Sequence, residues 1–327
     1  MAIVSRMEGC FESKIRLPEA LEGPNIMTNS KYLWQVMRPL LMVAVILSTY
    51  ACTSTQEVVL KPSFDFQLET IIEVEGRQGV ATDGKIYVVS GSQALYRYTL
   101  NGELLTQNLE PFIDLEGEVN HLGDIAIYDD EVYTGIENFI NGRGENIQIA
   151  IYDLETLTFK RSIPWEPASG QLEVCGIAID GSRQTVWLAD WLDGQYLYQY
   201  DLESGAYKGK IELDPVPRQI QGIMVRGDRL YLTADDGDAD FEKHDHIYSI
   251  TIPDGDAQDV SPVILEKTLD EFKRAGEVEG LCLSPTGDKL TVLLNRGTRI
   301  NLGMPQGFYP GYNREIHEIY IYSTILK

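Results

Sequence analysis

A short motif led by glycine recurs five times along this chain of 327 residues. In each copy a glycine opens a run of small or apolar residues, and successive glycines lie 44, 53, 46 and 58 residues apart. The five copies are Gly79-Val80-Ala81, Gly123-Asp124-Ile125-Ala126, Gly176-Ile177-Ala178, Gly222-Ile223-Met224 and Gly280-Leu281-Cys282. Self-similarity at a period of about 40 to 60 residues is typical of folds built from one repeated supersecondary unit.

The residues that follow each glycine motif keep a common order. A polar turn comes first, such as Thr82-Asp83-Gly84, and these residue types favour tight turns. A second strand follows, for example residues 85–89 (KIYVV). After a variable polar loop comes a third strand with alternating aromatic residues, for example residues 196–200 (YLYQY), and a further turn leads to a weaker outer strand. The sequence therefore predicts an all-β fold of four-stranded antiparallel blades, a β-propeller.

The number of repeats predicts five blades, with six as the alternative if one long repeat contains a degenerate blade. The fifth repeat stops at Lys327, just after its third strand, and so lacks an outer strand. Residues 68–74 (LETIIEV) precede the first repeat and form a strand with no repeat of its own. We expect this N-terminal strand to complete the last blade, because the pairing closes the ring and removes an exposed edge. The propeller domain is predicted over residues 65–327.

The N-terminal part has the pattern of a targeting segment. Residues 39–50 (PLLMVAVILSTY) are an apolar run too short to span a membrane comfortably, and they follow Lys31 and Arg38. Cys52 comes directly after the small residue Ala51, and this arrangement resembles a bacterial lipoprotein signal. The resemblance implies a lipid on Cys52, export across the inner membrane and a protein anchored in the cell envelope. Ordinary signal cleavage and an uncleaved anchor are the alternatives.

Residues 1–51 are assigned to this targeting segment and residues 52–64 to a polar linker. A translation start at Met27 or Met37 would give a more ordinary signal peptide, so the segment is interpreted as over-extended at its start.

Charge excludes several classes of partner. The 27 basic and 50 acidic residues give a formal net charge of −23. Nucleic acid is excluded because binding phosphates requires a clustered Lys/Arg surface, and electrostatic docking to anionic lipid is opposed as well. Cations and cationic ligands remain open. The alternative explanation is an acidic surface that keeps a secreted monomer soluble.

Two phrases carry a resemblance to known propellers: residues 277–297 (EVEGLCLSPTGDKLTVLLNRG) and 194–205 (GQYLYQYDLESG). They resemble blades of the NHL, YWTD and gluconolactonase-like group, and the resemblance extends over about residues 65–327. Gluconolactonase-like and paraoxonase-like members hold a catalytic calcium with Glu, Asn and Asp at the mouth of the channel. The resemblance implies that the positions to consider here are Glu137, Asn138, Asp190, Glu279 and Asn295.

Two sets of residues should meet on one face of such a ring, namely the connections into each first strand and the loops between second and third strands. The connections contain Arg77, Gln78, His121, Glu173, Cys175, Gln221 and Glu279. The loops contain Glu137, Asn138, Asp190, Asp235, Asp236, Asp238, Asp240, Asn295 and Arg296. These sets are rich in the oxygen ligands that Ca²⁺ prefers. Solvated loops of an acidic protein are the alternative, and residues 235–240 (DDGDAD) lack the bidentate Glu of an EF-hand.

Asp124 occupies a position that is apolar in the other four repeats, and His121 lies three residues earlier. A carboxylate in an apolar position costs free energy unless it is paired or bound. The two residues are interpreted as a general base with its orienting carboxylate, as part of a metal site, or as a structural hydrogen-bonded pair.

Residues 298–314 form a long Gly/Pro/aromatic insertion in the last repeat. Long loops in compact folds are usually lids or binding loops, so Phe308, Tyr309 and Tyr312 are candidates to stack on a sugar or another ring.

Two functions follow from these patterns. The first is a binding propeller of the cell envelope that recognises a small molecule or a protein partner through its upper face. The alternative is a calcium-dependent hydrolase of lactonase, esterase or phosphoesterase type with its metal at the channel mouth.

Overall fold

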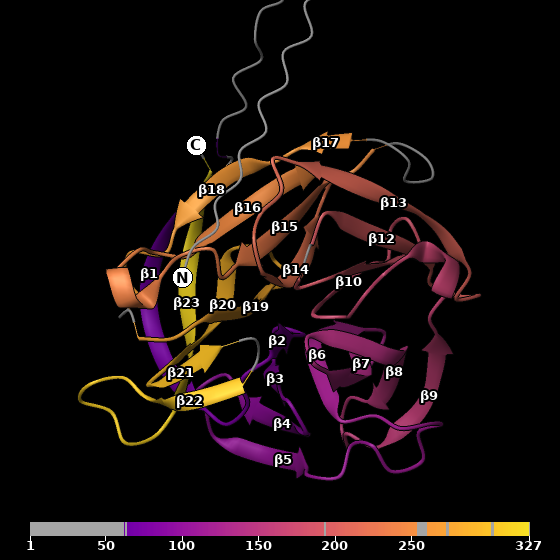
Figure 1. Cartoon of the computed structure of the whole chain (residues 1–327), viewed down its shortest axis with the longest axis horizontal. Coiled ribbons are helices and arrows are strands. Elements are labelled where there is room, and N and C mark those ends of the chain that lie inside the picture. Colours follow the sequence, from indigo (N-terminus) through magenta and orange to yellow (C-terminus); the bar gives the residue numbers. More distant parts are fainter. Residues whose placement is uncertain are drawn as a thin grey trace, which may run out of the picture. The chain divides into compact units, whose positions relative to one another are not determined.

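The computed structural model describes residues 62, 64–192, 194–253, 260–272, 275–301 and 304–326. These residues form a five-bladed β-propeller, with the blades arranged around a common axis (Figure 1). The predicted targeting segment 1–51, the proposed lipidation residue Cys52 and nearly all of the linker 52–64 lie outside the described residues. No helix in the described part of the chain has the length and apolar character needed to cross a membrane.

Each blade is a four-stranded antiparallel sheet whose strands follow one another from the axis outward. The first blade contains β2 (Gly79–Thr82), β3 (Ile86–Gly91), β4 (Ala94–Thr99) and β5 (Leu104–Asn108). The second contains β6 (His121–Tyr128), β7 (Glu131–Ile140), β8 (Arg143–Asp153) and β9 (Phe159–Pro164). The third contains β10 (Gly176–Asp180), β11 (Thr185–Ala189), β12 (Tyr196–Asp201) and β13 (Tyr207–Asp214). The fourth contains β14 (Ile220–Arg226), β15 (Arg229–Ala234), β16 (His246–Thr251) and β18 (Ile264–Thr268). The fifth contains β19 (Val278–Leu283), β20 (Lys289–Arg296), β23 (Ile316–Leu326) and β1 (Phe64–Val74).

The prediction of five blades is confirmed, and the six-bladed alternative is not. The longest repeat contributes one extra short strand, β17 (Val260–Pro262), which pairs in parallel with the outer edge of the third blade. The insertion in the last repeat forms a separate hairpin of β21 (Thr298–Asn301) and β22 (Met304–Phe308). Two 3-10 turns, η1 (Pro167–Ser169) and η2 (Ala239–Phe241), lie in the connections.

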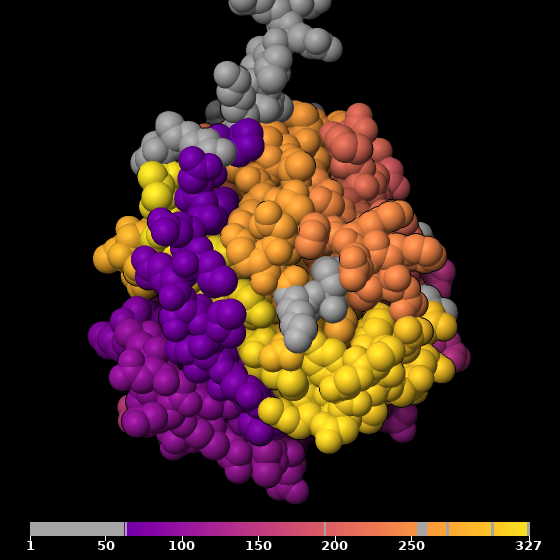
Figure 2. Space-filling view, turned by 90° about the vertical axis from the view of Figure 1, so that its left-hand side faces the viewer, coloured from indigo at the N-terminus to yellow at the C-terminus, as the bar shows by residue number. Residues whose placement is uncertain are grey.

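The ring is closed by strands from the two ends of the described chain. β1 pairs antiparallel with β23, from Phe64 opposite Leu326 to Val74 opposite His317. Figure 2 shows β1, in indigo, running along the rim of the ring. This is the predicted closure, although the strand begins earlier than residue 68.

Apolar side chains fill the space between neighbouring blades. Five buried clusters are present in the described residues, one at each interface between two blades. Along β11, Val186 and Leu188 face the second blade, whereas Trp187 and Ala189 face the fourth. Because successive side chains of a strand point to opposite faces, a blade between two others needs apolar residues at every position. Each fully buried Val or Leu contributes about 1.5–3 kcal/mol.

The repeated glycines lie where the first strands approach the axis. A Cβ atom on Gly222 would be 2.5 Å from the Cα atom of Gly280, and one on Gly280 would be 2.7 Å from the Cα atom of Gly79. No side chain fits at such separations, so this close backbone approach requires glycine. We call these residues, together with Gly123 and Gly176, the glycine ring.

Candidate functional site

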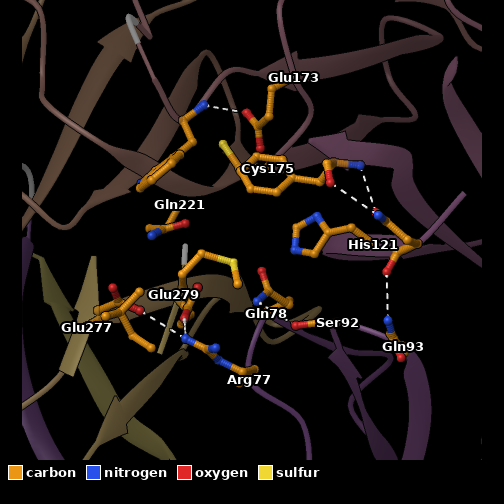
Figure 3. A pocket seen from close by; sticks show the side chains of 15 residues that line it. Arg77, Gln78, Ser92, Gln93, His121, Glu173, Cys175, Gln221, Glu277 and Glu279 are labelled. Carbon is orange, nitrogen blue, oxygen red and sulfur yellow. Dashed lines mark hydrogen bonds and ion pairs between the residues drawn. The ribbon is translucent and has the colours of Figure 1, made fainter. Parts of the chain in front are cut away.

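A hollow of about 280 Å³ lies at the axis, on the side of the glycine ring where the chain enters each first strand (Figure 3). We call it the cup. It is lined by Arg77, Gln78, Ser92, Gln93, Asn120, His121, Phe139, Glu173, Cys175, Trp191, Gln221, Glu277, Glu279, Ile300 and Met304. Four of the predicted ligand-binding residues, Arg77, Gln78, Glu173 and Gln221, are among them. All five blades contribute, because the residues just before each repeated glycine converge there.

The glycine ring and the side chain of Asp124 separate the cup from a second hollow. That second hollow, of about 110 Å³, is lined by the residues that follow the glycines, among them Ile125, Ile177 and Ile223. Asp124 is fully buried, and its Oδ2 atom accepts a hydrogen bond from the backbone N–H of Ile223 in the fourth blade (3.2 Å). Burial raises the pKa of Asp124 well above its ordinary value, while nearby backbone N–H groups oppose the rise. The carboxyl group therefore packs at the axis and does not line the cup.

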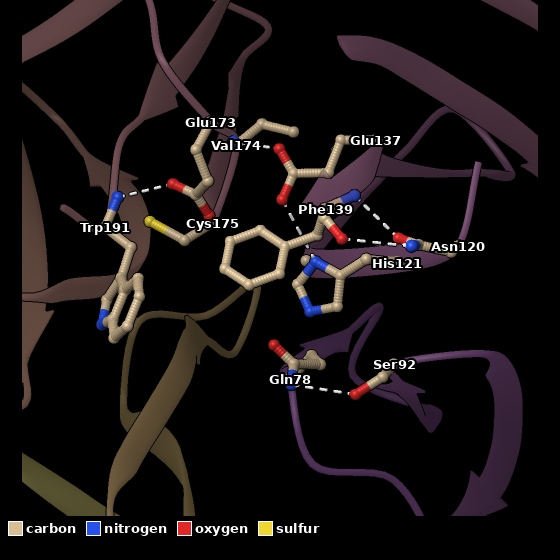
Figure 4. A network of polar contacts seen from close by, with 12 residues as sticks. Gln78, Ser92, Asn120, His121, Glu137, Phe139, Glu173, Val174, Cys175 and Trp191 are labelled. Atoms are coloured by element: carbon tan, nitrogen blue, oxygen red, sulfur yellow. Dashed lines mark hydrogen bonds and ion pairs between the residues drawn. The ribbon is translucent and has the colours of Figure 1, made fainter. Parts of the chain in front are cut away.

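His121 is held by Glu137 at the wall of the cup. The Nδ1 atom of His121 lies 3.3 Å from Oε1 of Glu137, whose other oxygen accepts the backbone N–H of Val174 at 3.0 Å. Glu137 is completely buried. Figure 4 shows the second ring nitrogen of His121 on the side of Gln78, away from Glu137. A carboxylate that accepts from Nδ1–H leaves Nε2 as an acceptor toward the cup.

The expected pairing of His121 with Asp124 is therefore corrected. His121 and Glu137 are direct neighbours across β6 and β7, and the register shifts between Leu122 and Ile125. Asp124 lies within this irregularity and is fully buried, with its carboxyl group bonded to the backbone of Ile223, so the two residues belong to different environments.

Aromatic rings form one wall of the cup beside His121. The ring of Phe139 lies 5.4 Å from that of His121 and 6.3 Å from that of Trp191, centroid to centroid. Asn120 fixes this wall, because its side chain accepts from the backbone N–H of Phe139 (2.7 Å) and donates to its carbonyl (3.1 Å). The backbone N–H of Trp191 donates to Glu173 at 2.6 Å (Figure 4).

Three buried carboxyl groups lie near the aromatic wall: Glu173, which lines the cup, and Glu137 and Asp190 behind it. Burial, and then the neighbouring Glu137 and Asp190, raise the pKa of Glu173 well above its ordinary value. Burial raises the pKa of Asp190 to about 7, although the hydroxyl of Tyr198 donates to it at 2.9 Å. No Lys or Arg of the described residues forms an ion pair with these three groups.

The opposite wall contains Arg77, the one guanidinium among the described residues that line the cup. Arg77 lies 3.0 Å from Glu277, 3.8 Å from Glu279 and 3.4 Å from Glu315. Burial raises the pKa of Glu277 to about 7 even with Arg77 beside it, and it raises the pKa of Glu279 well above its ordinary value. Glu279 also accepts from the side-chain amide of Asn295 at 2.5 Å. Three carboxyl groups thus share one cation.

Cys175 lines the cup as a buried thiol. Its Sγ atom donates to the carbonyl of Ile220 at 2.8 Å, and burial raises its pKa well above the ordinary value. Since the thiolate is the reactive form, Cys175 is a packing residue. Cys175 and Cys282 are both free and buried.

The residues predicted to hold calcium are divided between separate places. Glu137 and Asp190 lie behind the aromatic wall, whereas Glu279 and Asn295 lie beside Arg77. Asn138 is half-buried on β7, opposite Glu145 of β8. No group of three or more His, Cys, Asp or Glu residues in the described part of the chain is arranged to hold a metal ion. We derive no chemical step through calcium.

The acidic side chains of residues 235–240 interact with neighbouring residues. Burial and the neighbouring Asp245 raise the pKa of Asp235 well above its ordinary value. Asp236 lies 2.7 Å from Nδ1 of His246 and accepts from the hydroxyl of Tyr248. Asp238 caps η2 by accepting two backbone N–H groups.

The insertion 298–314 reaches the cup through its hairpin rather than through its aromatic residues. Ile300 and Met304 line the cup. Arg296, Tyr309 and Tyr312 line a different hollow of about 450 Å³. The hydroxyl of Tyr312 accepts from Arg296 at 3.3 Å, the Arg299 guanidinium lies 4.6 Å from the ring of Tyr309, and Phe308 is half exposed.

Sequence reasoning missed the residues that give the cup its chemical character. Phe139 and Trp191 were not predicted, because Phe139 lies near the end of a longer second strand, β7, whereas Trp191 follows the shorter strand β11. The available signal was a large apolar side chain directly after a loop carboxylate, as in Asp190-Trp191.

Comparisons with known proteins add no family to this description. No family model matches the chain, and no curated protein matches it. The chain is similar to a solved structure entitled "Crystal Structure of Mitotic Checkpoint Complex", with 11% identity and a TM-score of 0.37. The match covers 65% of this chain and 59% of that one, so this chain spans less than two thirds of its length. The resemblance to the NHL, YWTD and gluconolactonase-like group stays a prediction.

Proposed function

We propose that this propeller binds a small polar molecule in the cup, and that it does so in the bacterial cell envelope, anchored by a lipid on Cys52. The observation that carries the binding proposal is the convergence of hydrogen-bonding side chains from all five blades on one hollow. At about 280 Å³ the hollow is at the small end of ligand pockets. The N-terminal pattern of residues 39–52 supports the anchoring.

The cup offers a rigid wall and unused hydrogen-bonding groups. The fixed positions of Phe139 and His121 mean that little side-chain entropy is lost when a ligand is bound. Gln221 and the outer nitrogen of His121 project toward the space (Figure 3). An envelope protein that docks on the same face is the other partner predicted from the sequence.

The test is a thermal-shift screen of the full chain against small polar metabolites, followed by calorimetry of each compound that raises the melting temperature. Gln221→Met removes one polar group from the cup at similar length. Gln67→Met makes the same change at an exposed position of β1. A compound that binds in the cup loses affinity in the first variant and keeps it in the second. Equal affinity in both variants for every hit would contradict the proposal.

A hydrolase is the second candidate, and the geometry of His121 favours it. An imidazole oriented by a buried carboxylate, with a free nitrogen facing a cavity, is a suitable general base for activating water. The calcium-dependent form of this function would use the carboxylate and amide oxygens near the cup. Assays with lactones, carboxylic esters and phosphoesters, with and without calcium, test it, and activity that survives in both His121→Gln and Glu137→Gln would refute it.

A further inference from the structure

The cup carries an excess of acidic groups over basic groups. Among its lining residues Glu173, Glu277 and Glu279 are acidic and Arg77 is the one Lys or Arg. Arg77 is already shared among three carboxyl groups, and Glu173 is close to two further buried carboxyl groups. Among the described residues of the cup, no Lys or Arg is therefore left free to meet an anionic ligand. The whole chain adds to this field through its net charge of −23.

The aromatic wall supplies the second, independent feature. The rings of His121, Phe139 and Trp191 follow one another along one side of the cup, and Phe139 and Trp191 both line it (Figure 4). The face of an aromatic ring attracts a cation within about 6 Å, and Trp attracts it most strongly. Glu173 is tied to the backbone of Trp191, so a carboxyl group and an aromatic ring approach the cup together.

Glu173 forms no ion pair with a Lys or Arg of the described residues, and Glu277 shares Arg77 with two other carboxyl groups. Burial and repulsion from their own neighbouring carboxyl groups raise the pKa of Glu173 well above its ordinary value and that of Glu277 to about 7. A cation in the cup would counter both causes, because an opposite charge nearby favours the ionised form. Such a ligand would supply positive charge beside Glu173, as Arg77 supplies it to the carboxyl groups of the opposite wall.

We infer that the ligand of the cup is a small organic cation, an alkylammonium or amine, held against Phe139 and Trp191 with Glu173 as its counter-charge. This inference rests on the proposed binding function and specifies its ligand class. The volume of about 280 Å³ restricts the ligand to a small molecule.

The test is isothermal titration of the full chain at pH 8 with choline and with 3,3-dimethylbutan-1-ol, which has the same shape but carbon in place of the charged nitrogen. We expect choline to bind at least about tenfold more tightly than the neutral alcohol. Trp191→Leu and Glu173→Gln should each weaken choline binding by about tenfold, whereas Trp191→Phe should recover most of the loss because it keeps an aromatic face. Trp165→Leu, at a partly buried tryptophan outside the cup, should leave choline binding unchanged.

Circular dichroism and melting temperature establish that each variant is folded, and Trp191→Phe serves if Trp191→Leu is not. Equal affinity for choline and the alcohol would overturn the inference. Binding of glucose or acetate in the cup without binding of choline would also overturn it, while the proposed function would stand. If no compound of the metabolite screen bound either, both the inference and the proposed function would fail.

Discussion

Adding one methyl group at Gly280, where the glycine ring brings two backbones together, should destabilise the propeller strongly. A Cβ atom on Gly280 would lie 2.7 Å from the Cα atom of Gly79 in the neighbouring blade. Non-bonded carbon atoms make their best contact at about 3.5 to 4.0 Å, so the methyl group overlaps the neighbouring backbone by roughly 1 Å. Backbone held by two blades cannot move aside as a side chain does. We expect Gly280→Ala to lower the free energy of unfolding by about 3 kcal/mol, the upper part of the usual range for overpacking.

Gly176→Ala is the matched control, because it makes the same change in the same motif. Its Cβ atom would lie 3.2 Å from Cβ of Ala189 and 3.3 Å from the side chain of Ile223, so a relaxation of only a few tenths of an ångström relieves both contacts. Alanine also restricts the unfolded chain, which offsets about 0.4–1 kcal/mol. We expect its free energy of unfolding to stay within about 1 kcal/mol of the original protein.

Urea unfolding followed by circular dichroism measures both variants. If Gly280→Ala costs less than about 1 kcal/mol, or if both variants lose the same amount, the close approach of backbones is not what requires glycine there. Asp124→Ala in the Gly280→Ala background is a further check. It removes the contact with the carboxyl group but leaves the contact with Gly79, so it should recover only part of the loss.

Three further measurements test the site and the ring. The pKa of Asp190 rises from 3.8 to about 7 on folding, so the folded state binds more protons than the unfolded state between these pH values. The free energy of unfolding therefore falls as pH rises from about 4 to 7, by at most about 4 kcal/mol. Asp190→Asn should reduce this dependence in urea unfolding at several pH values, and an unchanged pH profile would refute the assignment. Ile72→Asp places a charge where β1, the outer strand of the last blade, packs against the first blade. We expect the free energy of unfolding to fall by about 2 kcal/mol. A fall below about 0.5 kcal/mol, the range of ordinary surface changes, would mean that β1 contributes little to closure. If calcium binds as the sequence predicts, adding it after EDTA raises the melting temperature of the full chain to a plateau, and Glu279→Gln removes the rise; no shift with calcium in the original protein would sink the prediction.

The blades could be predicted because both of their signals are local. Residues 85–89 (KIYVV) are a short run of β-branched and aromatic residues directly after a turn, and the predicted strand differs from β3 by only one or two residues at each end. Closure by residues 68–74 was also predictable, because a missing outer strand and an unassigned strand require each other. The short strand β17 was not predictable, since it has three residues and pairs with a neighbouring blade.

The contacts of the site could be predicted only in part. The residues before each repeated glycine were expected on one face, and the cup gathers them there. The partner of His121 could not be identified, because Glu137 is 16 residues away in the sequence and the pairing of β6 with β7 that places it opposite His121 is not visible in the sequence. Nor does the sequence show how far each loop reaches, and this decides that Phe139 and Trp191 line the cup while Tyr309 and Tyr312 line another hollow.

Pairing of β1 with β23 also sets the order in which the molecule can be finished during translation. Among the described strands β1 is synthesised first and its partner β23 last. The apolar side chains of Phe66 and Ile72 therefore stay exposed while four blades are made. The cup is also completed only at the end of synthesis, because Arg77 comes from the first connection, and Glu277 and Glu279 from the last. A chain released from the ribosome before the fifth blade is made would therefore lack both the strand pairing that closes the ring and the complete cup.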